Sequence, residues 1–232
     1  MNYFYQDILY LSLGAFFVFV LLGYIIYRRH LPTGGYLLSL VILLSMAGLS
    51  DLIFRWNPNP SWVLSASSLN VFCYSFALTI ILNYSIVHFF KDRIGLEPFW
   101  LFLILYLPAL IVTSIYVFSP LMVSYVLSSP LGFQLAYNPG YWALIVYGAM
   151  LVLPSALLNL IIAYQGKSPD EANQSIFLLF ILLLVVFFYC SVLIFPFLYR
   201  TVNFASPLPT AFAILILVYA YIRYEYFSLE KI

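Results

Sequence analysis

Seven long apolar runs constrain the fold of this 232-residue chain more than any other feature. They lie at approximately 7–27, 35–54, 63–90, 98–118, 140–164, 174–197 and 207–224. A helix needs roughly 20 mainly apolar residues to cross the hydrocarbon core of a bilayer. The runs do not alternate apolar and polar residues in ten-residue segments, as the strands of a membrane β-barrel do. The sequence therefore predicts an all-α integral membrane protein, a seven-transmembrane-helix bundle that forms one domain over residues 1–232.

The composition supports a lipid environment. Charged residues make up 7% of the chain and apolar residues 65%, with a mean hydropathy of +1.05. A soluble domain carries about 25% charged residues, more than three times as many. This balance excludes a water-soluble globule, a disordered chain and a nucleic-acid-binding protein, so the first partner we expect is the lipid bilayer.

The basic residues predict the orientation of the helices. Seven of the nine fall on one set of connectors, which holds Arg28, Arg29, Lys91, Arg93, Lys167, Arg223 and Lys231. The positive-inside rule assigns that set to the cytoplasm. We therefore expect the N-terminus outside, the C-terminus inside, and a multi-pass protein of the inner (plasma) membrane. No basic residue precedes the first run, and a basic segment follows it, so we expect a retained helix and not a cleaved signal peptide.

The residues that usually carry chemistry are placed unfavourably for it. All three lysines lie outside the runs, where none can form a Schiff base within a helix. The two histidines, His30 and His88, stand at the cytoplasmic ends of the first and third runs, and no common catalytic or phosphate-binding motif occurs. We therefore expect a protein that is not an enzyme, with no catalytic residue, metal or cofactor.

The third run holds the densest set of polar residues. Ser75 lies seven residues after Ser68, and Thr79 and Asn83 follow at steps of four residues. These spacings place the residues on one helical face. Polar groups inside a membrane tend to face the bundle interior, and we expect this face to point toward the fifth and sixth helices. Two interpretations stay open: a ligand-binding cavity wall, or hydrogen bonds between helices. Asn159 and Tyr189 are compatible with both.

Three charged residues are expected near the outer surface. Asp51 and Arg55 stand four residues apart at the end of the second run, a spacing that allows an ion pair on one helical face. Arg200 lies on another outer connector. These residues are candidates for binding a polar or anionic ligand, and the alternative is that they anchor the helices at the membrane interface.

The connector 119–139 is long and uncharged. Val123–Leu127 and Phe133–Tyr137 flank a turn-forming sequence at residues 128–132, which predicts a short extracellular β-hairpin between the fourth and fifth helices. Long connectors of this kind often serve as lids or binding loops. We expect the hairpin either to cover an outer cavity or to lie on the lipid surface.

The end of the sequence resembles a known family. Residues 206–209 read Ser-Pro-Leu-Pro, an apolar helix follows, and residues 220–229 read Ala-Tyr-Ile-Arg-Tyr-Glu-Tyr-Phe-Ser-Leu. This pattern is similar to the helix exit of the N-terminal seven-transmembrane-helix sensor region of bacterial histidine kinases. The third run, with Phe72-Cys73-Tyr74-Ser75-Phe76 through Phe89-Phe90, is similar but weaker. The resemblance implies a sensor whose last helix passes a change inward, although this sequence ends at Ile232 without a kinase domain.

The expectation is a non-enzymatic sensor or receptor-like module that acts in signal transduction through a separate membrane or membrane-proximal protein. A small or lipidic ligand fits that role. The candidate partner-binding residues are Arg223, Tyr224, Tyr226 and Phe227, which combine apolar anchors with charge. The alternative is an accessory or structural subunit of a larger membrane protein complex. A small transporter or intramembrane enzyme is a third alternative, disfavoured because we expect no buried acid beyond Asp51 and see no broken helices in matching halves.

Overall fold

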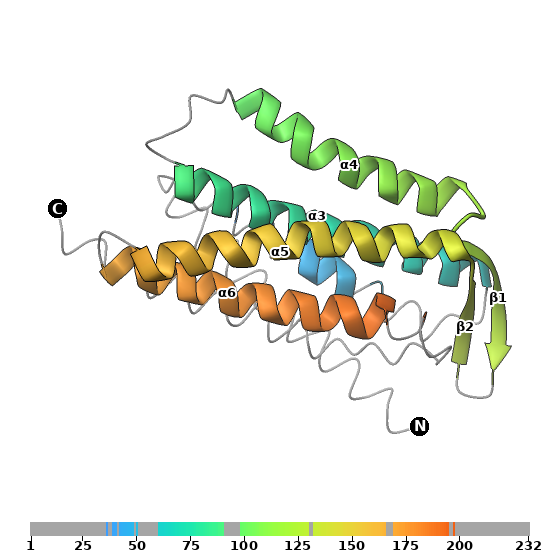
Figure 1. Cartoon of the computed structure of the whole chain (residues 1–232). Coiled ribbons are helices and arrows are strands. Elements are labelled where there is room, and N and C mark those ends of the chain that lie inside the picture. Colours follow the sequence, from blue (N-terminus) through green and yellow to red (C-terminus); the bar gives the residue numbers. More distant parts are fainter. Residues whose placement is uncertain are drawn as a thin grey trace, which may run out of the picture.

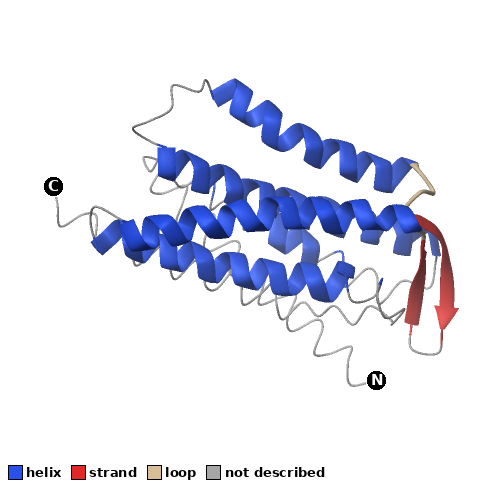
Figure 2. Ribbon diagram, viewed as in Figure 1, coloured by secondary structure: helices blue, strands red, loops and turns tan. Residues whose placement is uncertain are grey.

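The computed structural model describes residues 36, 39–40, 42–48, 50, 60–90, 98–129, 132–165, 169–194 and 197. Within this part the chain is mostly helical, with one small β-hairpin at an end of the helices (Figure 1). Figure 2 shows the same division between helices and strands. The predicted runs at 7–27 and 207–224 lie outside the described residues, and the described residues between 36 and 50 are all helical.

Four long helices make up most of the described chain: α3 (Pro60–Phe90), α4 (Pro98–Phe118), α5 (Trp142–Gln165) and α6 (Pro169–Tyr189). Three of them begin at a proline, which suits the first turn of a helix because its missing N–H would have no partner there. A 3₁₀ turn, η1 (Pro139–Tyr141), leads into α5. Residues 98–118 are helical over the whole predicted run, and the other three helices differ from their predicted runs only at the ends.

Helix α3 is the centre of the bundle, because it contacts α4, α5 and α6. In its most apolar stretch 67% of the residues are buried, whereas in that of α5 the share is 33%. Tyr74, Leu78 and Ile81 are among the largest fully buried side chains. Helix α4 approaches α5 near the hairpin and diverges from it toward Pro98 (Figure 1).

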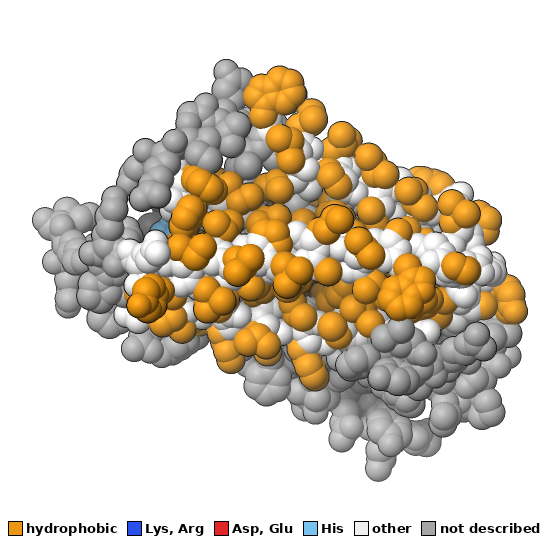
Figure 3. All heavy atoms as spheres, in the orientation of Figure 1, with side chains coloured by type: hydrophobic (Ala, Val, Ile, Leu, Met, Phe, Trp, Pro, Cys, Tyr) orange, Lys and Arg blue, Asp and Glu red, His pale blue; other side chains and the backbone are white. Residues whose placement is uncertain are grey.

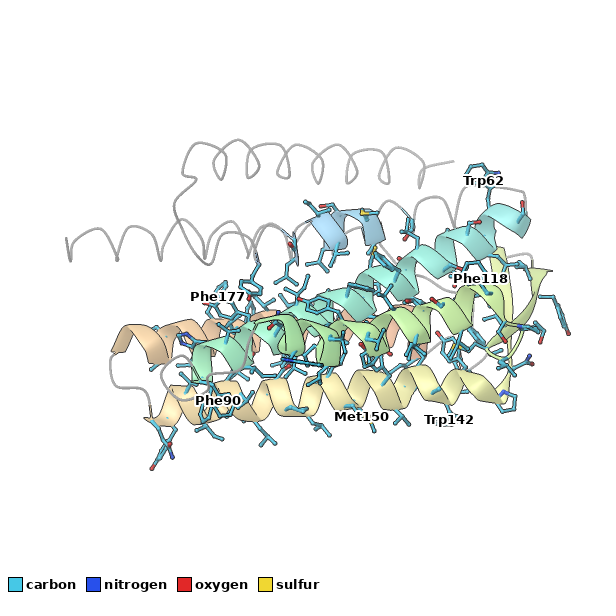
Figure 4. All side chains as sticks on the ribbon, turned by 90° about the horizontal axis from the view of Figure 1, so that it is seen from above. Trp62, Phe90, Phe118, Trp142, Met150 and Phe177 are labelled. Carbon is cyan, nitrogen blue, oxygen red and sulfur yellow. The ribbon has the colours of Figure 1, made fainter. Side chains whose placement is uncertain are left out.

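Within the described residues, two helices are long and apolar enough to cross a membrane, Ser61–Phe90 and Pro139–Gln165. The polarity of the surface is the reverse of that in a water-soluble protein. Large apolar side chains cover the visible face over α4 and α5 (Figure 3), and Met150 and Leu153 are more than 60% exposed. Trp62, Phe118 and Trp142 lie toward the hairpin end, and Met150 points away from the helices (Figure 4). Several serine, threonine and asparagine side chains, by contrast, are buried, among them Ser75, Thr79 and Asn159.

The hairpin consists of β1 (Val123–Ser129) and β2 (Gly132–Tyr137), paired antiparallel. The register places Val123 opposite Tyr137 and Ser129 opposite Gly132, with an irregularity between Val123 and Tyr125. Both extended segments that the sequence predicts are therefore strands, and each extends beyond the predicted range toward the turn.

Helix α6 does not continue as an α-helix to the end of its predicted run. A π-helical segment, η2 (Cys190–Ile194), follows Tyr189 directly. Pro196 stands two residues further on in the sequence. A proline has no N–H to donate to the carbonyl four residues before it, so an α-helical hydrogen bond to residue 192 cannot form.

Candidate functional site

The polar residues predicted on the third run lie inside the bundle. Ser75, Thr79 and Asn83, which we call the α3 polar stripe, are all buried, and Ser75 and Thr79 have no exposed surface. The Thr79 hydroxyl donates to the carbonyl oxygen of Ser75, at 2.8 Å. A hydroxyl that bonds back to its own helix in this way satisfies its proton without a neighbouring helix.

Two tyrosines from neighbouring helices reach the α3 polar stripe. Thr79 Oγ1 lies 3.0 Å from the hydroxyl of Tyr147 on α5. Because the Thr79 proton already bonds to Ser75, Tyr147 is the donor in this contact. The amide nitrogen of Asn83 donates to the hydroxyl of Tyr106 on α4, at 3.2 Å. The stripe thus links α3 to two helices.

The direction of Asn83 differs from the expectation that it points toward the fifth and sixth helices. Its amide contacts α4. Residues four apart are rotated by about 40° around a helix, because 3.6 residues complete a turn. Over two such steps, from Ser75 to Asn83, the face turns far enough to leave α5 and meet α4.

Two atoms of the stripe have no hydrogen-bond partner in the described chain, namely Ser75 Oγ and Asn83 Oδ1. An unsatisfied buried polar group costs about 1–3 kcal/mol, so such groups in folded proteins usually meet a partner. The hydroxyl of Ser75 is able to donate or accept a hydrogen bond, whereas the carbonyl of Asn83 only accepts one. These atoms mark the stripe as a candidate site for a polar ligand.

A second buried polar cluster joins α3 to α5. The amide nitrogen of Asn159 donates to Ser85 Oγ at 2.7 Å and to the Ser155 carbonyl at 2.8 Å. Ser85 in turn donates to the carbonyl of Ile81. The remaining atom of the amide, Asn159 Oδ1, has no partner among the described residues, and neither does Ser175 Oγ on α6. The bonds that are present hold helices together, as in the alternative interpretation of the sequence.

Tyr189, a predicted ligand-binding residue, makes a contact within the bundle. Its hydroxyl donates to the Leu144 carbonyl of α5 at 2.6 Å. The ring lies against the backbone of Gly148, where an added Cβ would be 2.7 Å from the Tyr189 hydroxyl oxygen. Glycine at 148 therefore allows α5 and α6 to approach closely. Any role of Tyr189 in ligand binding stays a prediction.

A polar clamp closes the base of the hairpin, and an aromatic cluster attaches it to the bundle. Asn138 donates its side-chain amide to the Pro120 carbonyl at 2.6 Å and accepts a bond from Ser124 at 2.7 Å. The ring of Tyr137 lies 4.7 Å from that of Tyr141, measured between centroids. Burial, with a smaller contribution from Tyr116, raises the pKa of the Tyr137 hydroxyl well above its ordinary value, so this group stays neutral.

Several predicted site residues lie outside the described residues. These are the outer candidates Asp51, Arg55 and Arg200 and the tail candidates Arg223, Tyr224, Tyr226 and Phe227. The described part of the chain contains no group of three His, Cys, Asp or Glu side chains arranged to hold a metal ion. The cysteines of this part, Cys73 and Cys190, form no disulfide bond with each other.

Comparison with protein-family models and with curated proteins finds no match to this chain.

Sequence reasoning missed the tyrosines that complete the stripe, Tyr106 and Tyr147. Both lie within apolar runs, where a tyrosine is typical of packing as well as of hydrogen bonding. Tyr106 stands among exposed apolar neighbours on α4 and is itself buried, so periodicity along α4 carries a weak signal for it. The sequence alone does not indicate which polar residue of a neighbouring helix a tyrosine contacts.

Proposed function

We propose that the protein is an integral membrane sensor or receptor-like module that is not an enzyme and that signals through a separate protein. In this proposal the chain forms seven membrane-spanning helices in the inner (plasma) membrane, with the N-terminus and the hairpin outside and the C-terminus in the cytoplasm. The distribution of basic residues, seven of nine on one set of connectors, supports the orientation. The two apolar helices of sufficient length support the membrane location.

The observation that carries the sensing role is the pair of unpartnered atoms in the α3 polar stripe, Ser75 Oγ and Asn83 Oδ1. They are separated by eight residues, about 12 Å along the helix at 1.5 Å per residue. The stripe is uncharged, and its neighbours are apolar and aromatic. These features favour a small or lipidic neutral ligand that brings a hydrogen-bond donor to Asn83.

The output side of the proposal is the C-terminal segment, with Arg223, Tyr224, Tyr226 and Phe227 as contacts for the partner. Its support is the resemblance of this segment to the helix exit of histidine-kinase sensor regions, together with its mixture of aromatic and charged residues. On the outer side, Asp51, Arg55 and Arg200 are the remaining candidates for contact with a polar ligand.

A second candidate function is an accessory subunit of a larger membrane protein complex. The observation that favours it is the width of the apolar surface. Leu107, Ile111 and Phe118 on α4 and Met150, Leu153 and Leu157 on α5 are all at least 46% exposed. Such faces pack against another membrane protein as readily as against lipid.

The partner is tested by purification in mild detergent. The full-length chain and a variant lacking residues 226–232 are compared, with a third variant in which Tyr226 and Phe227 are alanine. If the sensor proposal is correct, a partner co-purifies with the full-length chain and is lost from both variants, while each variant keeps its helical content. Equal recovery of every partner with all three chains contradicts the tail contact and favours the subunit alternative.

The ligand is tested by native mass spectrometry of the protein released from detergent. Asn83→Leu removes the unpartnered acceptor of the stripe, and Asn159→Leu is the matched control, because this asparagine is also buried, at the interface of α3 with α5. We expect a small molecule bound to the unmodified chain and to the control, and lost from Asn83→Leu. An identical set of bound molecules in all three samples contradicts the site.

A further inference from the structure

The π-helical segment η2 interrupts α6 next to the hairpin, at Cys190–Ile194. Single π turns inside α-helices are rare and occur frequently at functional sites. A π turn contains one residue more than the α turn it replaces, so an α-helical register is an alternative for residues 190–194, ahead of the proline at 196.

Hydrogen bonds from tyrosines hold both ends of the segment to α5 and its leading turn. At the start, the Tyr189 hydroxyl donates to the Leu144 carbonyl, at 2.6 Å. At the end, the Tyr141 hydroxyl donates to the carbonyl of Leu193, at 3.0 Å. The second bond takes up a carbonyl of the π segment itself, and so favours the register in which that carbonyl faces Tyr141.

An aromatic cluster connects the segment to the hairpin. Phe197, three residues beyond the segment, stacks on Tyr141 with 4.8 Å between ring centroids. Tyr137 of β2 contacts both rings, at 4.7 Å from Tyr141 and 5.7 Å from Phe197. Trp142 packs edge-on against Phe197 at 5.3 Å. The end of β2 and Phe197, which follows η2, thus share one set of contacts.

We propose that η2 is a conformational switch in α6, and that the hairpin controls its register through Tyr141 and Phe197. With the hairpin in place, these two side chains hold the π register. When the hairpin moves, the contacts of Tyr137 with both rings change, and the segment is free to take the α register. One residue corresponds to about 100° of helix rotation, so Phe197 cannot keep its stacking in both registers.

The coupling is independent of any ligand or partner. It places a two-state element between the outer hairpin and the long axis of α6, which is the kind of element that gives coupling a physical basis. The proposed switch is also separate from the proposed signalling role, because it can be measured on the purified chain without ligand or partner.

The test is hydrogen–deuterium exchange of the full chain in detergent, followed by mass spectrometry of peptides covering 190–194. Tyr141→Phe removes the bond to Leu193 and leaves the ring in place. The matched control is Tyr147→Phe, which removes a tyrosine bond of α5, also 3.0 Å long, that goes to Thr79 of α3 and not to η2. We expect exchange in 190–194 to rise about threefold in Tyr141→Phe, the effect of one typical hydrogen bond between membrane helices, and not in the control.

A second measurement uses Cys190 as a reporter in a Cys73→Ala background. Cys190 is partly buried at the start of the segment, so its maleimide labelling rate responds to the register. Phe197→Leu removes the stack on Tyr141, and we expect faster labelling than in the Cys73→Ala parent. Unchanged exchange in Tyr141→Phe, together with unchanged labelling in Phe197→Leu, overturns the proposal. A rise of equal size in Tyr147→Phe also overturns it, because the effect is then general loosening of α5.

Discussion

Replacing Gly148 with alanine puts a methyl group where the ring of Tyr189 lies. The new Cβ would be 2.7 Å from the hydroxyl oxygen and 2.8 Å from both Cε1 and Cζ, whereas ordinary contacts begin at 3.4 Å. The ring would have to move away by about 0.6 Å, the difference between the 2.8 Å carbon–carbon distance and the 3.4 Å of an ordinary contact. The 2.6 Å bond from Tyr189 to the Leu144 carbonyl does not survive such a movement with good geometry.

Three terms set the size of the effect. Overpacking of a filled interior costs about 1–3 kcal/mol. The weakened hydrogen bond adds about 0.6 kcal/mol, the average between membrane helices. Alanine is favoured over glycine within a helix by about 1 kcal/mol, which offsets part of this cost. We therefore expect Gly148→Ala to destabilise the protein by about 1–2 kcal/mol.

The assay is a double-mutant cycle with Tyr189→Ala, measured by reversible unfolding in mild detergent. Without the Tyr189 ring the clash is gone, so Gly148→Ala in that background should be neutral or stabilising. Gly140→Ala is the control, because its Cβ would meet the backbone of Leu121 and not Tyr189. Its cost should be the same in both backgrounds. The reasoning is refuted if Gly148→Ala has the same effect whether or not Tyr189 is present.

Three further predictions concern other parts of the molecule. Asn138→Ala removes the bonds to Pro120 and Ser124, so hydrogen exchange in residues 123–137 should rise severalfold while exchange in α3 is unchanged. Ser85→Ala removes an acceptor of the Asn159 amide, and the free energy of unfolding should fall by about 0.6 kcal/mol and by no more than ~1.7 kcal/mol. Single cysteines at positions 129 and 228, in a chain lacking the native cysteines, should label from opposite sides of the membrane, and labelling of both from outside intact cells contradicts the proposed orientation.

The helices and the hairpin were predictable from the sequence. Long apolar segments have few alternatives to a helix, and turn-forming residues between two β-prone segments have few alternatives to a hairpin. The run at 98–118 is helical throughout, since a continuous apolar segment of that length satisfies its backbone only within itself. The uncharged connector that follows contains two β-prone segments around a proline and a glycine, and these are β1 and β2.

The π segment and the tyrosine contacts were not predictable from periodicity. Cys190–Ile194 is as apolar as the helix before it, and one additional residue in a turn leaves the composition unchanged. Pro196 indicates that the α-helix is disturbed nearby, but not that the disturbance is a π turn. The contact of Tyr189 with Gly148 depends on how closely two helices approach, which a single sequence does not encode locally.

Three of the hydroxyl groups inside the bundle bond in the same direction. Thr79, Ser85 and Ser155 each give their proton to a carbonyl four residues earlier on the same helix, and the Asn159 amide protons are likewise in use. These groups therefore offer a ligand only their lone pairs, as hydrogen-bond acceptors. If a ligand enters this part of the bundle, an alcohol, an amine or a water molecule donates to these lone pairs, whereas an ether has no proton to donate. Such a preference needs no charged residue.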